Sequence, residues 1–115
     1  MQKYNVNLTE DAENDIAELM AFYEELVDAE SAEKFLEEAL DTVAGLVNLP
    51  RSNAKFKDDP DVRKVQMENH KVAIVYLVDE DRFEVIAVRA YHQMQNPTQY
   101  QKSIRERIRR IQDKK

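Results

Sequence analysis

Two apolar segments in the second half of the chain most constrain its fold. Residues 71–78 have the sequence KVAIVYLV and residues 83–91 the sequence FEVIAVRAY, and both are dense in β-branched and aromatic residues. Such composition favours strands, and apolar residues on both faces predict strands in the middle of a sheet. The polar tetrapeptide Asp79-Glu80-Asp81-Arg82 between them predicts a hairpin loop, although it lacks the glycine that tight hairpin turns favour.

Two amphipathic helices are predicted upstream of these strands. Apolar residues recur every three or four positions over residues 10–27 and again over residues 31–48, which is the period of one helix face. Thr9 and Ser31 can cap the two helices, and Pro50 disfavours helical geometry in the residue before it. Because residues 28–30 leave so short a link, we expect an antiparallel helical hairpin.

The remaining segments complete one α+β domain over residues 1–115. We expect strands at 3–8 and 62–68, a loop or irregular extended arm at 51–60, and a basic helix at 98–115 with apolar residues at helical spacing. The predicted order is therefore β-α-α-β-β-β-α. It describes a helical hairpin packed on a largely antiparallel sheet, with an extra basic C-terminal helix.

Composition excludes several classes of protein. The 115 residues include no cysteine and one glycine, so disulfide-stapled folds, thiolate zinc sites and glycine-rich phosphate loops are ruled out. No segment approaches the roughly 18 consecutive apolar residues that cross a bilayer, and the polar N-terminus lacks a signal-peptide core. We therefore expect no membrane association and a cytoplasmic location.

The net charge of −6 conceals an asymmetry between the two parts of the chain. Residues 1–50 hold 13 acidic and 2 basic side chains, whereas residues 51–115 hold 10 acidic and 15 basic ones. Any contact with phosphate is expected from the second part. The alternative is that the helices expose carboxylates to solvent and the last helix happens to be basic.

Basic and aromatic residues of the second part are the candidates for chemistry. No serine has a recognisable nucleophile elbow, and the two histidines show no ligand spacing, so we expect neither metal nor cofactor. RNA cleavage without a metal needs a base, cations for the phosphorane and an acid, which lysine, arginine, histidine and tyrosine can supply. The candidates are Lys55, Lys57, Arg63, Lys64, His70, Lys71, Arg89, Tyr91, His92 and Tyr100.

Arg89 is the most informative of these residues, because the strand around it is otherwise apolar. Its guanidinium either binds phosphate or forms a structural salt bridge with an acidic residue of a helix. His92, just past the strand, and Arg63, at the start of another, likewise have a structural and a functional interpretation.

The chain resembles the RelE/ParE superfamily of type II toxin-antitoxin toxins. The most specific match is Arg-x-x-His at Arg89 to His92, followed by Pro97. The resemblance extends over most of the chain. Further matches are Ala12, Asp15, Ile16 and Tyr23 in the first helix, Ala32, Phe35, Leu46 and Pro50 around the second, and Arg63 and His70-Lys71 near the strands.

The resemblance implies a growth-inhibiting toxin, of the kind linked to plasmid stabilisation, that a cognate antitoxin neutralises. One activity is a ribosome-dependent mRNA endonuclease, or mRNA interferase, and this is the activity we expect first. Two alternatives remain: a ParE-like inhibitor of DNA gyrase without catalysis, and a degenerate member that only binds antitoxin. Lys71, Gln95 and Asn96 depart from the usual family residues, and the pI near 5.0 is unlike the strongly basic RNases.

Each activity assigns roles to particular residues. For an endonuclease, the catalytic residues would be Arg63, Arg89, His92 and Lys71, with the ribosome and its mRNA as partners. A homodimer or a toxin-antitoxin hetero-oligomer is compatible with each alternative. The residues expected to bind RNA or a partner protein are Lys55, Lys57, Lys64, Tyr91 and Tyr100.

Overall fold

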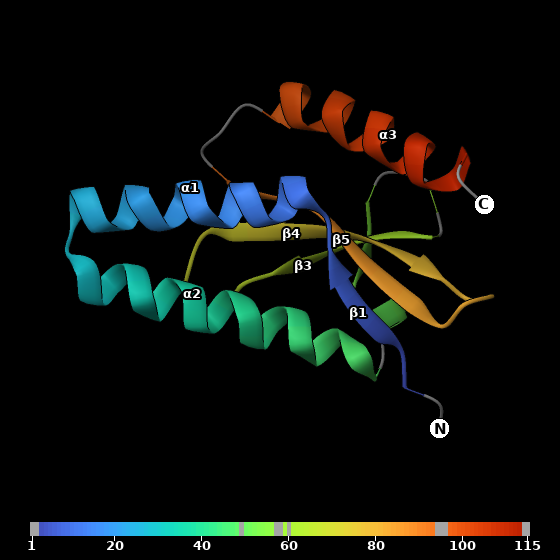
Figure 1. Cartoon of the computed structure of the whole chain (residues 1–115), viewed down its shortest axis with the longest axis horizontal. Helices are drawn as coiled ribbons and strands as arrows, with labels where there is room; N and C mark the ends of the chain where they lie inside the picture. The colour runs from blue at the N-terminus through green and yellow to red at the C-terminus, as the bar shows by residue number, and fades with distance from the viewer. Residues whose placement is uncertain (1–2, 49, 57–58, 60, 94–96, 114–115) are drawn as a thin grey trace.

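The computed structural model is an α+β domain, and it describes residues 3–48, 50–56, 59, 61–93 and 97–113. Three helices pack on a five-stranded mixed sheet of order β1-β5-β4-β3-β2 (Figure 1). Its strands are β1 (Asn5–Leu8), β2 (Ala54–Lys55), β3 (Val62–Gln66), β4 (Val72–Asp79) and β5 (Glu84–His92). The α-helices are α1 (Glu10–Leu26), α2 (Ala29–Ala44) and α3 (Pro97–Asp113), and the short 3-10 turns η1 (Gly45–Val47) and η2 (Pro50–Ser52) follow α2.

The predicted central hairpin is confirmed. β4 and β5 pair antiparallel, and all eight residues of β4 are buried because both faces of the sheet are covered. The turn between them works without glycine: Asp79 Oδ1 accepts the backbone N–H groups of Asp81 and Arg82, and Phe83 takes a positive φ of 49°. An aspartate that bonds the backbone two residues ahead replaces the expected turn signal.

The helical hairpin is also confirmed, with one boundary corrected. Thr9 caps α1 as expected, since its side chain accepts the N–H of Ala12. The second helix starts at Ala29, not near Ser31, because Asp28 is the capping residue and accepts the N–H of Ser31 at 2.8 Å. The link between the helices is therefore Val27 and Asp28, shorter than the predicted link at 28–30.

Strand β1 makes the sheet mixed, because it pairs parallel with β5. It ends at Leu8, opposite Ala87, so the second half of β5 pairs with β4 on one side and with no described strand on the other. On that side the capping residue of α1 bonds the strand instead: the Thr9 hydroxyl donates to the Val88 carbonyl. A β-bulge leaves Val88 without a partner on β4, and bulges of this kind redirect neighbouring side chains.

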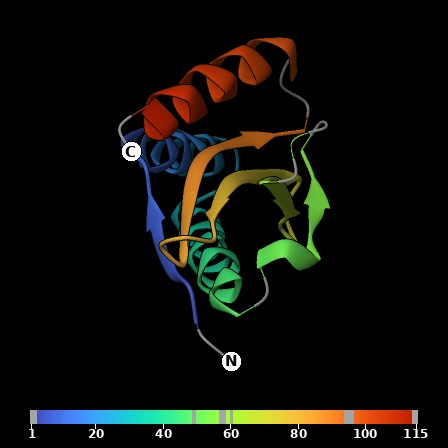
Figure 2. The ribbon, with the colours of Figure 1, turned by 90° about the vertical axis from the view of Figure 1, so that its right-hand side faces the viewer.

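The two faces of the sheet carry different layers (Figure 2). Phe35 of α2 and Ile16 of α1 pack with Ile74 on one face, whereas Ile104 and Ile108 of α3 pack with residues of β3, β4 and β5 on the other. The basic C-terminal helix thus covers the sheet and does not stand free. No helix within the described ranges is long and apolar enough to cross a bilayer.

The segment predicted as a loop at 51–60 contains more order than expected. Its residues Ala54 and Lys55 form the short edge strand β2, which pairs antiparallel with Lys64 and Arg63. The segment is anchored by Tyr76 of β4, whose buried hydroxyl donates to the Pro50 carbonyl and accepts from the Asn53 amide. These long-range contacts have no local sequence signal.

Candidate functional site

Arg89 has the structural role that the sequence left as one of two alternatives. Its guanidinium donates two hydrogen bonds to Asp15 of α1, from Nε to Oδ2 at 2.6 Å and from a terminal nitrogen to Oδ1 at 2.8 Å. Both side chains are largely buried, with exposed fractions of 18% for Arg89 and 8% for Asp15. The sequence predicted an acidic helix residue as one possible partner of Arg89, but it did not identify Asp15 as that residue.

Asp15 also binds the backbone of β5 on the side that β1 does not reach. The same carboxylate oxygen that binds Arg89 accepts the backbone N–H of Ala90 at 2.9 Å. Asp15 therefore accepts three hydrogen bonds from two consecutive residues of the strand. A buried carboxylate requires such saturation, and a phosphate that bound the Arg89 guanidinium would compete with it directly.

Arg63 lies on the opposite side of β4 from Arg89. It is opposite Tyr76 in the register, and one terminal nitrogen donates to the Asn53 carbonyl at 3.1 Å. Within the described ranges, Arg63 forms no ion pair and its buried Nε has no hydrogen-bond acceptor. Lys55, opposite Arg63 on β2, is exposed, and Lys64 alternates to the other face of the sheet.

Lys71 and His92 lie together at one end of the sheet. The Lys71 carbonyl accepts the N–H of Gln93, and the adjacent pair Val72 and His92 is in register. Lys71 is exposed, whereas the His92 ring packs 6.2 Å from the ring of Phe22. Val72, the partner of His92, is four residues along β4 from Tyr76, the partner of Arg63, or about 13 Å at the rise of a strand.

Tyr91 faces α3 and packs against the cluster that contains Ile104 and Ile108. Burial raises the pKa of its hydroxyl above the ordinary value, so Tyr91 is a poor proton donor or acceptor near neutral pH. Lys57 lies outside the described residues, as does the side chain of Tyr100. The candidates that the structure describes therefore lie on two faces and one end of the sheet.

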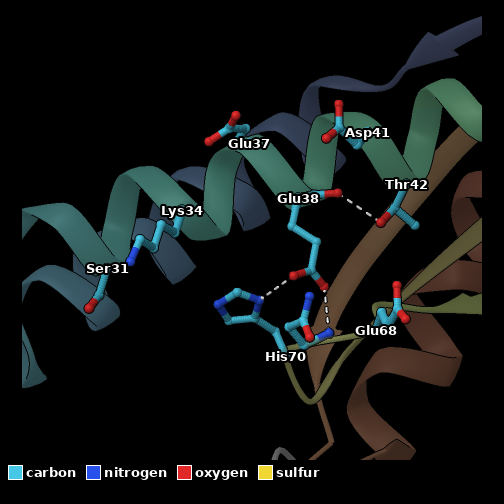
Figure 3. Close-up of a pocket in the computed structure, with 9 residues that line it drawn as sticks. Ser31, Lys34, Glu37, Glu38, Asp41, Thr42, Glu68 and His70 are labelled. Atoms are coloured by element: carbon cyan, nitrogen blue, oxygen red, sulfur yellow. Dashed lines mark hydrogen bonds and ion pairs between the residues drawn. The ribbon is translucent and has the colours of Figure 1, made fainter.

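A pocket that the sequence did not predict lies between α2 and the turn before β4 (Figure 3). It has a volume of about 710 Å³, and its centre is Glu38, which binds the Asn69 backbone N–H at 2.8 Å and His70 Nδ1 at 3.1 Å. The His70 ring also packs against Tyr23 and Phe35, at 5.1 and 5.3 Å. Glu38 and His70 join α2 to the sheet, so their contact is structural.

We expect this contact to make stability sensitive to acid. Burial alone would raise the pKa of Glu38, but the hydrogen bonds from Asn69 and His70 outweigh it and hold the pKa below the ordinary value of 4.5. A carboxyl group whose pKa falls on folding stabilises the native state above its unfolded pKa, and that contribution is lost as pH falls through the folded pKa. The free energy of unfolding of the wild type, measured with urea, should therefore decrease below about pH 4.5.

The matched control is Glu38→Gln, which cannot titrate. Its free energy of unfolding should be lower than that of the wild type at pH 7, and the two should approach each other at pH 3. A difference between the two proteins that stays constant from pH 7 to pH 3 would contradict the assignment.

The three helices packed on a five-stranded mixed sheet have the arrangement of a RelE/ParE toxin. The sequence profile of the ParE toxin of type II toxin-antitoxin systems, parDE, matches residues 6–97. The chain therefore belongs to the ParE toxin family. The match ends at Pro97, where α3 begins.

Solved structures show the same fold at low sequence identity. The chromosomal ParDE system of P. aeruginosa matches with a TM-score of 0.67 and 20% identity, covering 77% of this chain and 95% of that one. A mutant of the E. coli toxin RelE in the free state matches at 0.62 and 16%, covering 96% and 99%. The RelBE2 toxin-antitoxin complex of Mycobacterium tuberculosis matches at 0.57 and 15%, covering 83% and 97%. The comparison with curated protein sequences found no significant match.

Proposed function

We propose that this chain is the toxin of a type II toxin-antitoxin system and that it stops growth by binding DNA gyrase, without catalysing a reaction itself. This choice reverses the order of the two activities that the sequence favoured. The target is cytoplasmic, so the toxin acts in the cytoplasm. The second partner is a cognate antitoxin, because structurally similar proteins were solved in toxin-antitoxin complexes.

The observation that carries this proposal is the buried ion pair between Arg89 and Asp15. The guanidinium expected to stabilise a phosphorane is bound by a buried carboxylate through two hydrogen bonds. Metal-free RNA cleavage needs a base, an acid and cations within hydrogen-bond reach of one phosphate. Arg63, Tyr91 and His92 lie on different faces or ends of the sheet, which supports protein binding over catalysis.

The burial of one sheet face is the second support. Ile104 and Ile108 of α3 cover residues of β3, β4 and β5, so a strand of mRNA could not lie across this face without moving the helix. An inhibitor that binds gyrase through its outer surface needs no such movement.

Induced expression in a bacterial host tests the proposal. Growth, mRNA 5′ ends within ribosome-covered reading frames and the DNA-damage response are followed in the same culture. We expect growth arrest and an induced DNA-damage response without new cuts in reading frames. Arrest with new in-frame cuts and no damage response would overturn the proposal in favour of the endonuclease, and normal growth would indicate a degenerate member.

A further inference from the structure

A small cavity lies between α3 and the edge of the sheet. Its volume is about 280 Å³, below the roughly 300 to 1,000 Å³ of small-molecule sites, so it fits one or two side chains. Phe56, Val62, Ile104 and Ile108 give it an apolar lining. The helix that forms one wall follows the segment matched by the family profile, so the cavity depends on this C-terminal extension.

Two arginines mark the rim of this cavity. Arg105 and Arg109 are exposed and one helical turn apart, about 5 to 6 Å between Cβ atoms. Among the residues that the structure describes, the acidic side chain of Asp59 also lines it. An apolar cavity beside two cations suits an apolar side chain that is flanked by carboxylates.

The chain itself carries such a segment at the tip of its helical hairpin. Leu26 and Val27 are 65% and 63% exposed and adjacent in the chain, so together they form a small apolar patch on the surface. Glu24, Glu25 and Asp28 surround them, and all three are exposed. We refer to residues 24–28 as the hairpin tip. It is apolar at its centre and acidic at its edges, the complement of the cavity.

We propose that this protein self-associates by inserting the hairpin tip of one copy into the α3 cavity of another. The tip lies at the turn between α1 and α2, at the other end of the molecule from the C-terminal part of α3 (Figure 1), and the cavity is lined by Ile104, Ile108 and Arg109 of that helix. We take the exchange to be reciprocal about a two-fold axis, because this arrangement uses both surfaces of both copies and closes as a dimer, whereas a one-way contact would extend into a filament. This dimer does not depend on the identity of the toxin's target.

Charge reversal tests the contact, because the altered positions are exposed and do not support the core. In sedimentation equilibrium we expect a dimer for the wild type. Arg105→Glu with Arg109→Glu should weaken dimerisation about tenfold or more, as should Glu24→Lys with Glu25→Lys. Arg110→Glu is the matched control, since Arg110 is exposed on α3 outside the cavity, and it should dimerise as the wild type does.

The decisive sample is a mixture of the two double variants. Each one alone opposes like charges at both contacts, whereas the mixed pair restores opposite charges at both, so a heterodimer should form. A wild-type chain that remains monomeric at 100 µM, or a mixture that does not associate, would overturn the proposal. So would a monomeric chain whose antitoxin binding is lost in Arg105→Glu with Arg109→Glu, because the cavity would then belong to the antitoxin.

Discussion

Asp15→Ala should destabilise the protein more than any other single change at an acidic residue. It removes the acceptor of three hydrogen bonds and leaves the Arg89 guanidinium largely buried without its carboxylate. Breaking one side of a buried ion pair costs about 3 to 5 kcal/mol. Urea unfolding at pH 7 should therefore show a loss of about 3 kcal/mol, and thermal unfolding a midpoint lower by roughly 10 °C.

The matched control is Glu18→Ala, a surface carboxylate on the same helix, which should change stability by less than about 0.5 kcal/mol. The double variant Asp15→Leu with Arg89→Met should recover most of the loss, because it leaves no unpaired charge. If Asp15→Ala proved as stable as Glu18→Ala, the ion pair between Asp15 and Arg89 would not stabilise the fold, and the structural role of Arg89 would be wrong.

This pair changes how a loss of toxicity at Arg89 should be interpreted. Arg89→Ala leaves the Asp15 carboxylate buried without its cation, so we expect the variant to lose stability, and to lose activity in proportion to its unfolded fraction, whatever the activity is. The fraction folded, measured by circular dichroism, must accompany every toxicity assay of an Arg89 variant. The double variant Asp15→Leu with Arg89→Met separates the alternatives, since it keeps the fold and removes the guanidinium.

Ile104→Ala is the second change with a large expected effect. Ile104 is fully buried between α3 and the sheet, in a cluster with Val75 and Val88. Truncating a buried isoleucine to alanine costs about 2 to 5 kcal/mol through lost transfer free energy and the cavity left behind. Hydrogen exchange should show weaker protection of the α3 amides, while the strands β4 and β5 remain protected.

Lys102→Ala is the control for this change, because Lys102 is exposed on the same helix. It should leave exchange in α3 unchanged. If Ile104→Ala left the α3 amides as protected as in the wild type, the helix would be held by other contacts, such as the ion pair between Arg107 and Asp11. The packing of Ile104 would then not explain the covered sheet face.

Elements with strong local patterns were predictable from the sequence. The central hairpin follows from two apolar segments, and the start of α1 follows from a capping threonine with acidic residues after it. The predicted start of α2 was wrong because two possible capping residues, Asp28 and Ser31, lie three positions apart. The Asp28 side chain caps the helix by accepting the backbone N–H of Ser31. The local sequence does not indicate which of two nearby capping residues begins the helix.

Long-range pairing could not be predicted. Nothing near Asp15 identifies it among the 13 acidic residues of the first 50 as the partner of an arginine 74 positions away. The packing of α3 could not be predicted for the same reason, since its isoleucines require cover but do not specify which surface supplies it. The candidate cations were all visible in the sequence, but their separation onto different faces depends on strand register.

The central claim is inhibition of gyrase without catalysis, and a supercoiling assay with purified components tests it most directly. Purified toxin is added to bacterial DNA gyrase with relaxed plasmid and ATP, beside the triple variant Arg63→Ala, Lys71→Ala, His92→Ala. We predict that wild type and triple variant inhibit supercoiling at similar concentrations, provided both are folded. Undisturbed supercoiling, together with wild-type cleavage of mRNA on translating ribosomes that the triple variant lacks, would contradict the account.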